Sequence, residues 1–293
     1  MQGLLVINKP KGITSFGVVA FLRKILGEKR IGHTGTLDPM ASGVLIVLVG
    51  RPCVLSDYIM SGSKSYVAKL RLGLKTDTYD ITGEVINSSD KKVEENEFIA
   101  ALNSFLGESL QTPPMFSAKK VDGKKLYELA REGKEIERKQ MAINISEIKL
   151  LSFNDNEAEI LVTCSKGTYI RSLIDDIGER LGSFATMTDL IRIENGGFSI
   201  NEAVDMNKLS AENVGDYILS SEKAVSQYQA VNVTSKQATR FYNGGELDLN
   251  RLHGVNLSEN EIARVKYINK FVGLGKKVGD TLKVLCPIEN PNL

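Results

Sequence analysis

Asp38 occupies the position in this 293-residue sequence that is best suited to chemistry. It lies in a stretch rich in glycine and threonine, residues 31–43, and directly precedes Pro39. A proline biases the residue before it toward extended backbone, so the Asp38 carboxylate can point out of a turn into a cavity. A carboxylate with an ordinary pKa of roughly 3.9 is ionised at neutral pH and can attack a carbon centre or remove a proton. The alternative interpretation is a turn-forming Asp-Pro pair, which is the commoner use of such dipeptides.

Arg171 is the second residue whose position calls for a chemical reason. The apolar spacing of residues 170–181 predicts a helix, and Arg171 would lie in its first turn. A cation gains nothing there from the helix dipole, which favours anions, so a nearby carboxylate would explain the arginine. Tyr66 and Tyr169 are aromatic residues at expected element boundaries, where each can pack against a core or stack on a nucleobase.

Two other kinds of site are disfavoured by the sequence. The segment 31–43 lacks the lysine and Ser/Thr pair of a Walker sequence, and no GxGxxG follows an expected strand, which argues against binding of a nucleoside triphosphate. His33 and His253 are the only histidines, which argues against a histidine-based metal centre.

The cysteines and the apolar runs indicate the compartment. The three cysteines, Cys53, Cys164 and Cys286, are odd in number and far apart, which predicts neither a disulfide framework nor a CxxC metal site. We therefore expect a reducing compartment and a cytoplasmic protein. No apolar run reaches the roughly 18 residues of a membrane span. The N-terminus has no basic region and no cleavage site of a signal peptide, so neither a membrane nor secretion is expected.

The formal net charge of +1 is unevenly distributed along the chain. Residues 1–36 carry six Lys and Arg against one Glu, and residues 115–140 carry eight basic against five acidic side chains. Residues 201–230 carry five acidic against two basic side chains. The basic segments can form a phosphate-binding face on a neutral protein, or they can be ordinary solvated helix and loop surfaces.

The elements that must position Asp38 and Arg171 are predicted as a mixture of strands and helices. Apolar runs and alternation predict strands at residues 4–7, 44–49, 66–74, 143–151 and 158–164. Helical spacing predicts helices at residues 98–106, 126–130 and 170–181, and one that starts at Thr14 or Ser15 and ends at Gly27. The segment 31–43 shows neither period and is predicted to be a loop.

This order of elements predicts an α+β fold in two parts. Strands and helices are interspersed, but the strands alternate in the antiparallel manner, which favours α+β over a doubly wound parallel sheet. The polar, acidic stretch near residues 205–230 is the expected boundary, and short apolar runs and turns follow it. We therefore predict a larger domain at 1–225 and a small β-rich module at 226–293.

Several motifs in a fixed order resemble one known family. The stretch GHTGTLDPMASGVL at residues 32–45, which contains Asp38, looks like the signature of the TruB family of tRNA pseudouridine synthases. Further matches follow, namely NKPKG at 8–12, KSY at 64–66, GLKTDT at 73–78, TPPMFSA at 112–118, GKKLY at 123–127, SKGTYIR at 165–171 and GGF at 196–198. The resemblance covers about residues 3–200, and the C-terminal module matches only weakly.

The resemblance implies a fold and an activity. The implied fold is the α+β pseudouridine synthase fold on a mixed, mainly antiparallel sheet, with a PUA-like RNA-binding module at the C-terminus. The implied activity is isomerisation of the T-loop uridine at tRNA position 55, by a stand-alone monomer with no obligatory protein partner. This reaction breaks the N1–C1′ bond, turns the uracil and joins C5 to C1′. It needs no redox step and no phosphate transfer, so no cofactor and no metal are expected.

The resemblance also implies roles for particular residues. Asp38 would be the nucleophile and Arg171 its ion-pair partner. The implied substrate-binding residues are Tyr66, which stacks on the target base, Tyr169, which shapes the pocket, His33, which packs against the T loop, Leu190, which lines the base pocket, and Lys9 and Lys64. The sequence departs from the family at Ile191, where the family usually has arginine, so one basic contact to RNA is missing.

Two other functions stay open from the sequence. One is a non-catalytic protein that binds or folds tRNA, for which a paired Asp38 and Arg171 would have no use. The other is a guide-RNA-dependent pseudouridine synthase of the related eukaryotic and archaeal kind, which would be inactive on a bare stem-loop.

Overall fold

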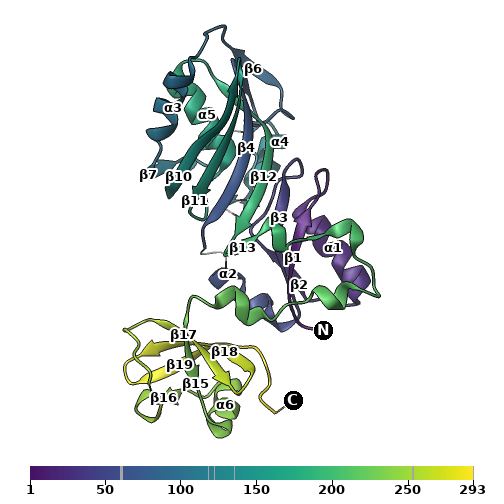
Figure 1. Cartoon of the computed structure of the whole chain (residues 1–293), viewed down its shortest axis with the longest axis vertical. Helices are drawn as coiled ribbons and strands as arrows, with labels where there is room; N and C mark the ends of the chain where they lie inside the picture. Colours follow the sequence, from purple (N-terminus) through teal and green to yellow (C-terminus); the bar gives the residue numbers. More distant parts are fainter. Residues whose placement is uncertain (60–61, 118, 122, 135, 253, 293) are drawn as a thin grey trace.

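Two large β-sheets organise the chain (Figure 1). The computed structural model describes residues 1–59, 62–117, 119–121, 123–134, 136–252 and 254–292. The larger sheet has the strand order β14-β1-β3-β12-β4-β11-β10-β7, with β2 paired to β3 and β13 to β12. Its strands are β1 (Gly3–Lys9), β2 (Ile31–Thr34), β3 (Ser42–Val49), β4 (Lys64–Leu72), β7 (Gly107–Gln111), β10 (Met141–Asn154), β11 (Glu157–Cys164), β12 (Ala185–Asn195), β13 (Phe198–Ser199) and β14 (Val204–Asp205).

The sheet is mixed but mainly antiparallel, which confirms the predicted fold class. The pairs β12 with β3 and β1 with β14 are parallel, whereas β1–β3, β3–β2, β12–β4, β4–β11, β11–β10 and β10–β7 are antiparallel. The alternation expected along residues 66–74 is present, because Ala68, Leu70 and Leu72 are buried on one face of β4.

Helices cover the two halves of this sheet (Figure 1). Helix α1 (Ser15–Leu26) packs Val18 and Leu22 against Leu5 and Val47 of the β1–β3 half. Helices α3 (Glu95–Asn103) and α5 (Ile170–Leu181) cover the β4–β10 half with one apolar face each. The shorter elements of this part are α2 (Ser56–Ile59), α4 (Leu126–Arg131) and two small hairpins, β5 (Leu74–Thr76) with β6 (Val85–Ser88) and β8 (Lys120–Val121) with β9 (Lys124–Lys125).

The predicted ends of α1 are confirmed. The Thr14 side chain caps the helix by accepting a hydrogen bond from the Gly17 N–H at 2.9 Å. Gly27 ends it with a left-handed backbone, φ 64°.

Parts of the sequence-based prediction are wrong. The first four residues of the expected loop 31–43 form β2, because Ile31 is buried and the backbone pairs with β3. Strand β12 was not predicted, because bulges after Met187 and after Arg192 interrupt its alternation. Strand β7 was missed too, because four of its five residues are exposed and carry no apolar pattern.

The second sheet forms a β-rich C-terminal module, as predicted. Its strand order is β15-β17-β18-β19-β16, from β15 (Gln229–Asn232), β16 (Leu247–Asp248), β17 (Ile262–Tyr267), β18 (Lys270–Val278) and β19 (Thr281–Pro287). The helix α6 (Ser235–Tyr242), which was not predicted, packs on this sheet. Before the module, the chain passes through short 3₁₀ turns, and Leu219 pairs with Leu4 at the edge of the first sheet. A division of the chain at 225/226 stays a prediction.

Candidate active site

The loop that carries Asp38 spans residues 35–41, between β2 and β3. Ser15, at the start of α1, holds this loop through both backbone groups of Leu37. The Ser15 Oγ donates to the Leu37 carbonyl at 3.0 Å and accepts from the Leu37 N–H at 2.8 Å. A second contact comes from the turn after β1, where the Gly12 N–H donates to the Pro39 carbonyl at 2.8 Å.

Arg192 of β12 also supports this loop. Its side chain is buried in β12 and donates to the Val44 carbonyl at 2.7 Å and to the Gly35 carbonyl at 3.0 Å. Strands β12 and β3 pass so closely that a Cβ at Gly43, whose φ is 106°, would lie 2.2 Å from the Arg192 carbonyl oxygen. Arg192 was not singled out from the sequence, and its contacts lie on residues about 150 positions away.

Arg171 and Asp38 form an ion pair. The Arg171 Nε lies 2.9 Å from the Asp38 Oδ2, and the two side chains are 5% and 35% exposed. The other guanidinium nitrogens donate to the Phe116 carbonyl at 2.8 Å and to the Thr78 carbonyl at 3.1 Å. The arginine is therefore fixed on several sides, while the aspartate keeps access to solvent.

Asp80 is a site residue that the sequence reasoning missed. Its Oδ2 lies 3.7 Å from the Arg171 Nη1, so a second carboxylate flanks the guanidinium. Its Oδ1 accepts hydrogen bonds from the Thr78 hydroxyl at 3.0 Å and from the Thr82 N–H at 3.0 Å. The signal was present in the sequence, since Thr78, the last residue of the GLKTDT motif, alternates with Asp80 and Thr82 in a stretch that suits a tight polar turn.

Tyr66 and Leu190 lie in one buried cluster with Leu37, the residue before Asp38. Tyr66 on β4 is directly opposite Arg192 on β12. Burial raises the pKa of the Tyr66 hydroxyl, and the Arg192 cation opposes this in part. The uncharged Tyr66 ring and the apolar Leu190 side chain therefore lie beside the loop that carries the carboxylate.

Lys9 and Lys64 are both buried lysines. Burial lowers the pKa of Lys9 to about 8, against the opposing charge of Asp38. The Lys9 ammonium donates to the carbonyls of Pro10 and Ile13 at 2.9 and 2.8 Å and is wholly inaccessible to solvent. The ammonium thus holds the turn after β1, and the RNA contact expected for Lys9 from the sequence stays a prediction. Burial, followed by the nearby Arg192, lowers the pKa of Lys64 to about 8.

His33 and Ile191 lie on strands beside the loop. His33 lies on β2, where burial and then Arg192 lower its pKa, so the ring is neutral at pH 7. Its buried Nδ1 has no hydrogen-bond partner within the part of the chain that the structure describes. Ile191 lies on β12, half-buried between Ser42 of β3 and Val67 of β4.

Tyr169 is the residue immediately before α5. Gln111, at the end of β7, holds its backbone on both sides. The Tyr169 N–H donates to the Gln111 Oε1 at 2.8 Å, and the Gln111 Nε2 donates to the Tyr169 carbonyl at 3.1 Å. Gln111 is buried and fixes Tyr169, the residue before α5, two residues before Arg171. Ala118, the last residue of the TPPMFSA motif, lies outside the described residues.

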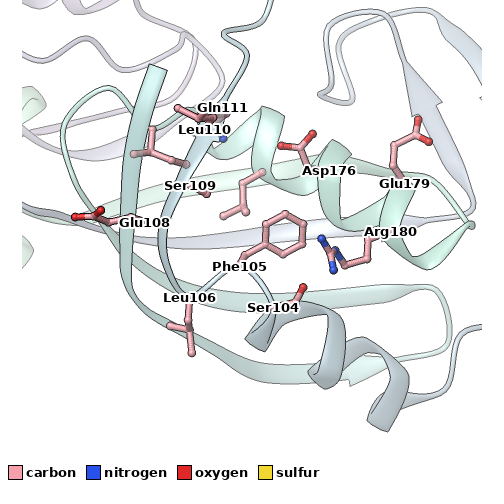
Figure 2. A pocket seen from close by; sticks show the side chains of 12 residues that line it. Ser104, Phe105, Leu106, Glu108, Ser109, Leu110, Gln111, Asp176, Glu179 and Arg180 are labelled. Carbon is pink, nitrogen blue, oxygen red and sulfur yellow. The ribbon is translucent and has the colours of Figure 1, made fainter. Parts of the chain in front are cut away.

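A cavity of about 500 Å³ is not part of this site (Figure 2). It lies between α5, the end of α3 and β7, and Phe105 and Arg180 line it. The α5 residues that line it are Leu173, Asp176, Glu179 and Arg180, and neither Asp38 nor Arg171 is among the lining residues. The surroundings of Asp38 and Arg171 are therefore identified by their side-chain geometry rather than by the size of a cavity.

The whole chain has the fold of the pseudouridine synthases. A chain of an H/ACA RNP bound to a substrate RNA containing 2′-deoxyuridine matches with a TM-score of 0.76 at 24% identity, over 99% of this chain and 86% of that one. A chain of a Cbf5-Nop10-Gar1 complex matches with a TM-score of 0.75 at 26% identity, over 98% of this chain and 84% of that one. The mixed sheet and the C-terminal β-rich module are thus common to both.

The sequence comparisons identify the family. Residues 23–170 match the N-terminal domain of the TruB family of pseudouridylate synthases, and residues 171–226 match the tRNA pseudouridylate synthase B C-terminal domain. The chain is 47% identical to the tRNA pseudouridine synthase B of Clostridium novyi (strain NT), over 97% of this chain and 98% of the relative. It is 41% identical to that of Fusobacterium nucleatum, over 100% and 98%. The chain belongs to the TruB family of pseudouridylate synthases and is an isomerase.

Among the described residues, no helix combines the length and the apolar character that a membrane crossing requires.

Proposed function

We propose that this chain converts the T-loop uridine at tRNA position 55 into pseudouridine, with Asp38 as the nucleophile. The observation that carries the proposal is the ion pair of Asp38 with the buried Arg171, on a loop held by three other parts of the chain. The relatives that share 41–47% identity with the chain bear the name tRNA pseudouridine synthase B, which supports tRNA as the substrate.

In this proposal Arg171 aims Asp38 at the substrate. Its Nε lies 2.9 Å from the Asp38 carboxylate, and its hydrogen bonds to the Thr78 and Phe116 carbonyls leave the guanidinium little freedom to turn away. Asp38 then acts on the uridine while the N1–C1′ bond breaks and the C5–C1′ bond forms. C5 loses its proton in this exchange and N1 gains one, so the overall change is an isomerisation. Product and substrate have the same atoms and the same oxidation state, so the reaction is complete with no cofactor.

The target base must leave its stack to reach Asp38, which costs a few kcal/mol. We propose that Tyr66 stacks on the uracil, at a gain of about 1–3 kcal/mol, while Leu190 and Tyr169 line its pocket. The apolar cluster of Tyr66, Leu190 and Leu37 beside Asp38 supports this arrangement. Such a wall would also keep water from the detached sugar.

Outside the pocket, we propose that His33, Lys64 and the basic segments 1–36 and 115–140 contact the T loop and its phosphates. Asp122 and Glu135 of the second segment lie outside the described residues. The module at 226–293 is proposed as a further RNA-binding surface. Since phosphate contacts release counterions, RNA affinity should fall steeply as salt rises. A stand-alone monomer without a protein partner and a cytoplasmic location stay predictions.

The test is to incubate the purified chain with an unmodified T-stem-loop RNA and to map pseudouridine by mass. The proposal predicts one pseudouridine at the T-loop position with no other component. RNA that binds but stays unmodified would favour the tRNA-binding or tRNA-folding alternative. Activity that appears only with an added guide RNA would favour the guide-dependent alternative.

A further inference from the structure

Helix α5 carries a second charged cluster on the same face as Arg171. Arg171, Asp175 and Glu179 follow one another at intervals of four residues, so they lie in one row along the helix. Lys75 of β5 approaches this row from the neighbouring hairpin. Its Nζ lies 3.0 Å from the Asp175 Oδ1 and 2.6 Å from the Glu179 Oε1, and 5.5 Å from the centre of the Tyr79 ring.

The cluster is partly buried and connects the β5–β6 hairpin to helix α5. The side chains of Lys75 and Asp175 are 17% and 9% exposed. Burial acts to lower the pKa of Lys75, but the hydrogen bonds to Glu179 and Asp175 outweigh it and raise that pKa, so the lysine is charged at pH 7. Removal of one partner from such a pair leaves the other charge buried without compensation, which is costly.

Lys75 lies directly before the turn at residues 76–83, which delivers Asp80 and the Thr78 carbonyl to Arg171. The turn contains a strained residue, because Tyr79 has a left-handed backbone with φ 63°. A non-glycine residue in this conformation costs on the order of 1–3 kcal/mol and persists only where its surroundings hold it. One support is on β12, where the Met187 N–H donates to the Tyr79 carbonyl at 3.1 Å.

We propose that Lys75 is a positioning residue for the isomerisation. By pairing with Asp175 and Glu179 it fixes the turn 76–83 against α5. The turn then holds the Arg171 guanidinium in the orientation that meets Asp38. This inference rests on the function proposed above, because the effect of Lys75 is exerted on the rate of that reaction through Arg171.

The experiment measures single-turnover rates with saturating T-stem-loop RNA, together with RNA affinity. Lys75→Met should slow the reaction by about 10- to 100-fold, because small displacements of a positioned group have effects of this size. RNA affinity should stay within about 2-fold, since Lys75 is directed toward α5. Lys75→Arg, which can still reach both carboxylates, should keep the rate within about 3-fold.

The matched control is Lys149→Met. Lys149 also pairs with a carboxylate, Glu147 at 2.5 Å, but the pair is exposed on β10. This variant should keep the wild-type rate within about 2-fold, as expected for an exposed ion pair. If Lys75→Met does not fold, Glu179→Gln removes one partner at a more exposed position, and it should slow the reaction by about 3-fold without loss of RNA affinity.

A double variant separates positioning from general stability. In an Asp80→Asn background, Lys75→Met should slow the reaction by less than about 3-fold. The contact between residue 80 and Arg171, which Lys75 positions, is already weakened in that background. Equal losses in both backgrounds, or an unchanged rate of Lys75→Met, would overturn this inference while leaving the proposed function intact. A wild-type chain that makes no pseudouridine would overturn both.

Discussion

The loop at residues 35–41 and the turn at 76–83 both present a carboxylate to Arg171, but they do so in different ways. Asp38 is about one-third exposed, and its loop is held by Ser15 of α1 and Arg192 of β12. Asp80 is buried, its Oδ1 accepts hydrogen bonds within its own turn, and its Oδ2 faces Arg171. Support from outside leaves Asp38 available to a substrate, whereas Asp80 is occupied with holding the turn and the arginine. The difference suggests that the first carboxylate reacts and the second one positions.

Neutralising Asp38 gives the largest expected effect and tests the difference between the two carboxylates most strongly. Asp38→Asn keeps the size of the side chain but removes the proposed nucleophile, so the rate of pseudouridine formation should fall by about 1000-fold or more. Filter binding of T-stem-loop RNA should change by less than about 3-fold, because the phosphate-binding surface is untouched. A loss clearly smaller than about 1000-fold would remove Asp38 from the role of nucleophile.

Neutralising Asp80 should have a smaller effect. Asp80→Asn keeps the amide oxygen that can accept from Thr78 and Thr82, but it removes the second negative charge beside Arg171. The single-turnover rate should fall by about 100-fold, because Arg171 is then less well oriented. A loss as large as that of Asp38→Asn would mean that the two carboxylates are equally involved in the chemistry.

The external support of the Asp38 loop can be weakened at Ser15. Ser15→Ala removes two hydrogen bonds to Leu37 and leaves buried backbone groups without a partner, at a cost of about 1–3 kcal/mol. The melting temperature should fall by a few degrees, and the reaction should slow by about 10-fold. Ser146→Ala is the matched control, because its hydroxyl donates to one carbonyl on an exposed part of the sheet. An unchanged rate for Ser15→Ala would show that the loop needs no support from α1.

The buried Lys9 offers the mildest test, through pH. Its pKa falls from 10.5 in the unfolded chain to about 8 in the folded chain, so the folded chain binds fewer protons between these values. The free energy of unfolding of the wild type, relative to Lys9→Met, should therefore rise by about 2 kcal/mol from pH 7 to pH 10. Urea unfolding at the two pH values measures this difference. A difference that is flat or falls with pH would mean that Lys9 is not held in an unfavourable environment.

The sequence predicted residues that are marked by their immediate neighbours in the chain, and it missed residues whose role depends on distant segments. Asp38 and Arg171 were found because local signals, a proline and a helix start, surround each of them. Asp80 was missed because its role depends on Arg171, which is 91 positions away. The supports at Ser15, Gln111 and Arg192 were missed for the same reason, since each holds backbone groups of a distant segment.

The elements show the same pattern. Helices with one apolar face, such as α1 and α5, were predicted because their periodicity lies within the helix itself, and the ends of α1 were predicted from the capping residues beside it. Strand β12, which lies between β3 and β4 in the sheet, was missed. Its bulges and its polar residues are compensated by neighbours on both sides, so its alternation is not visible in the sequence.

The most direct measurement maps pseudouridine in a full-length, unmodified tRNA transcript treated with the purified wild-type chain or with Asp38→Asn. The account predicts a single pseudouridine at position 55 with the wild type alone, and none with the variant at equal RNA occupancy. Pseudouridine at a different position, no product from the wild type, or product from the variant would contradict it.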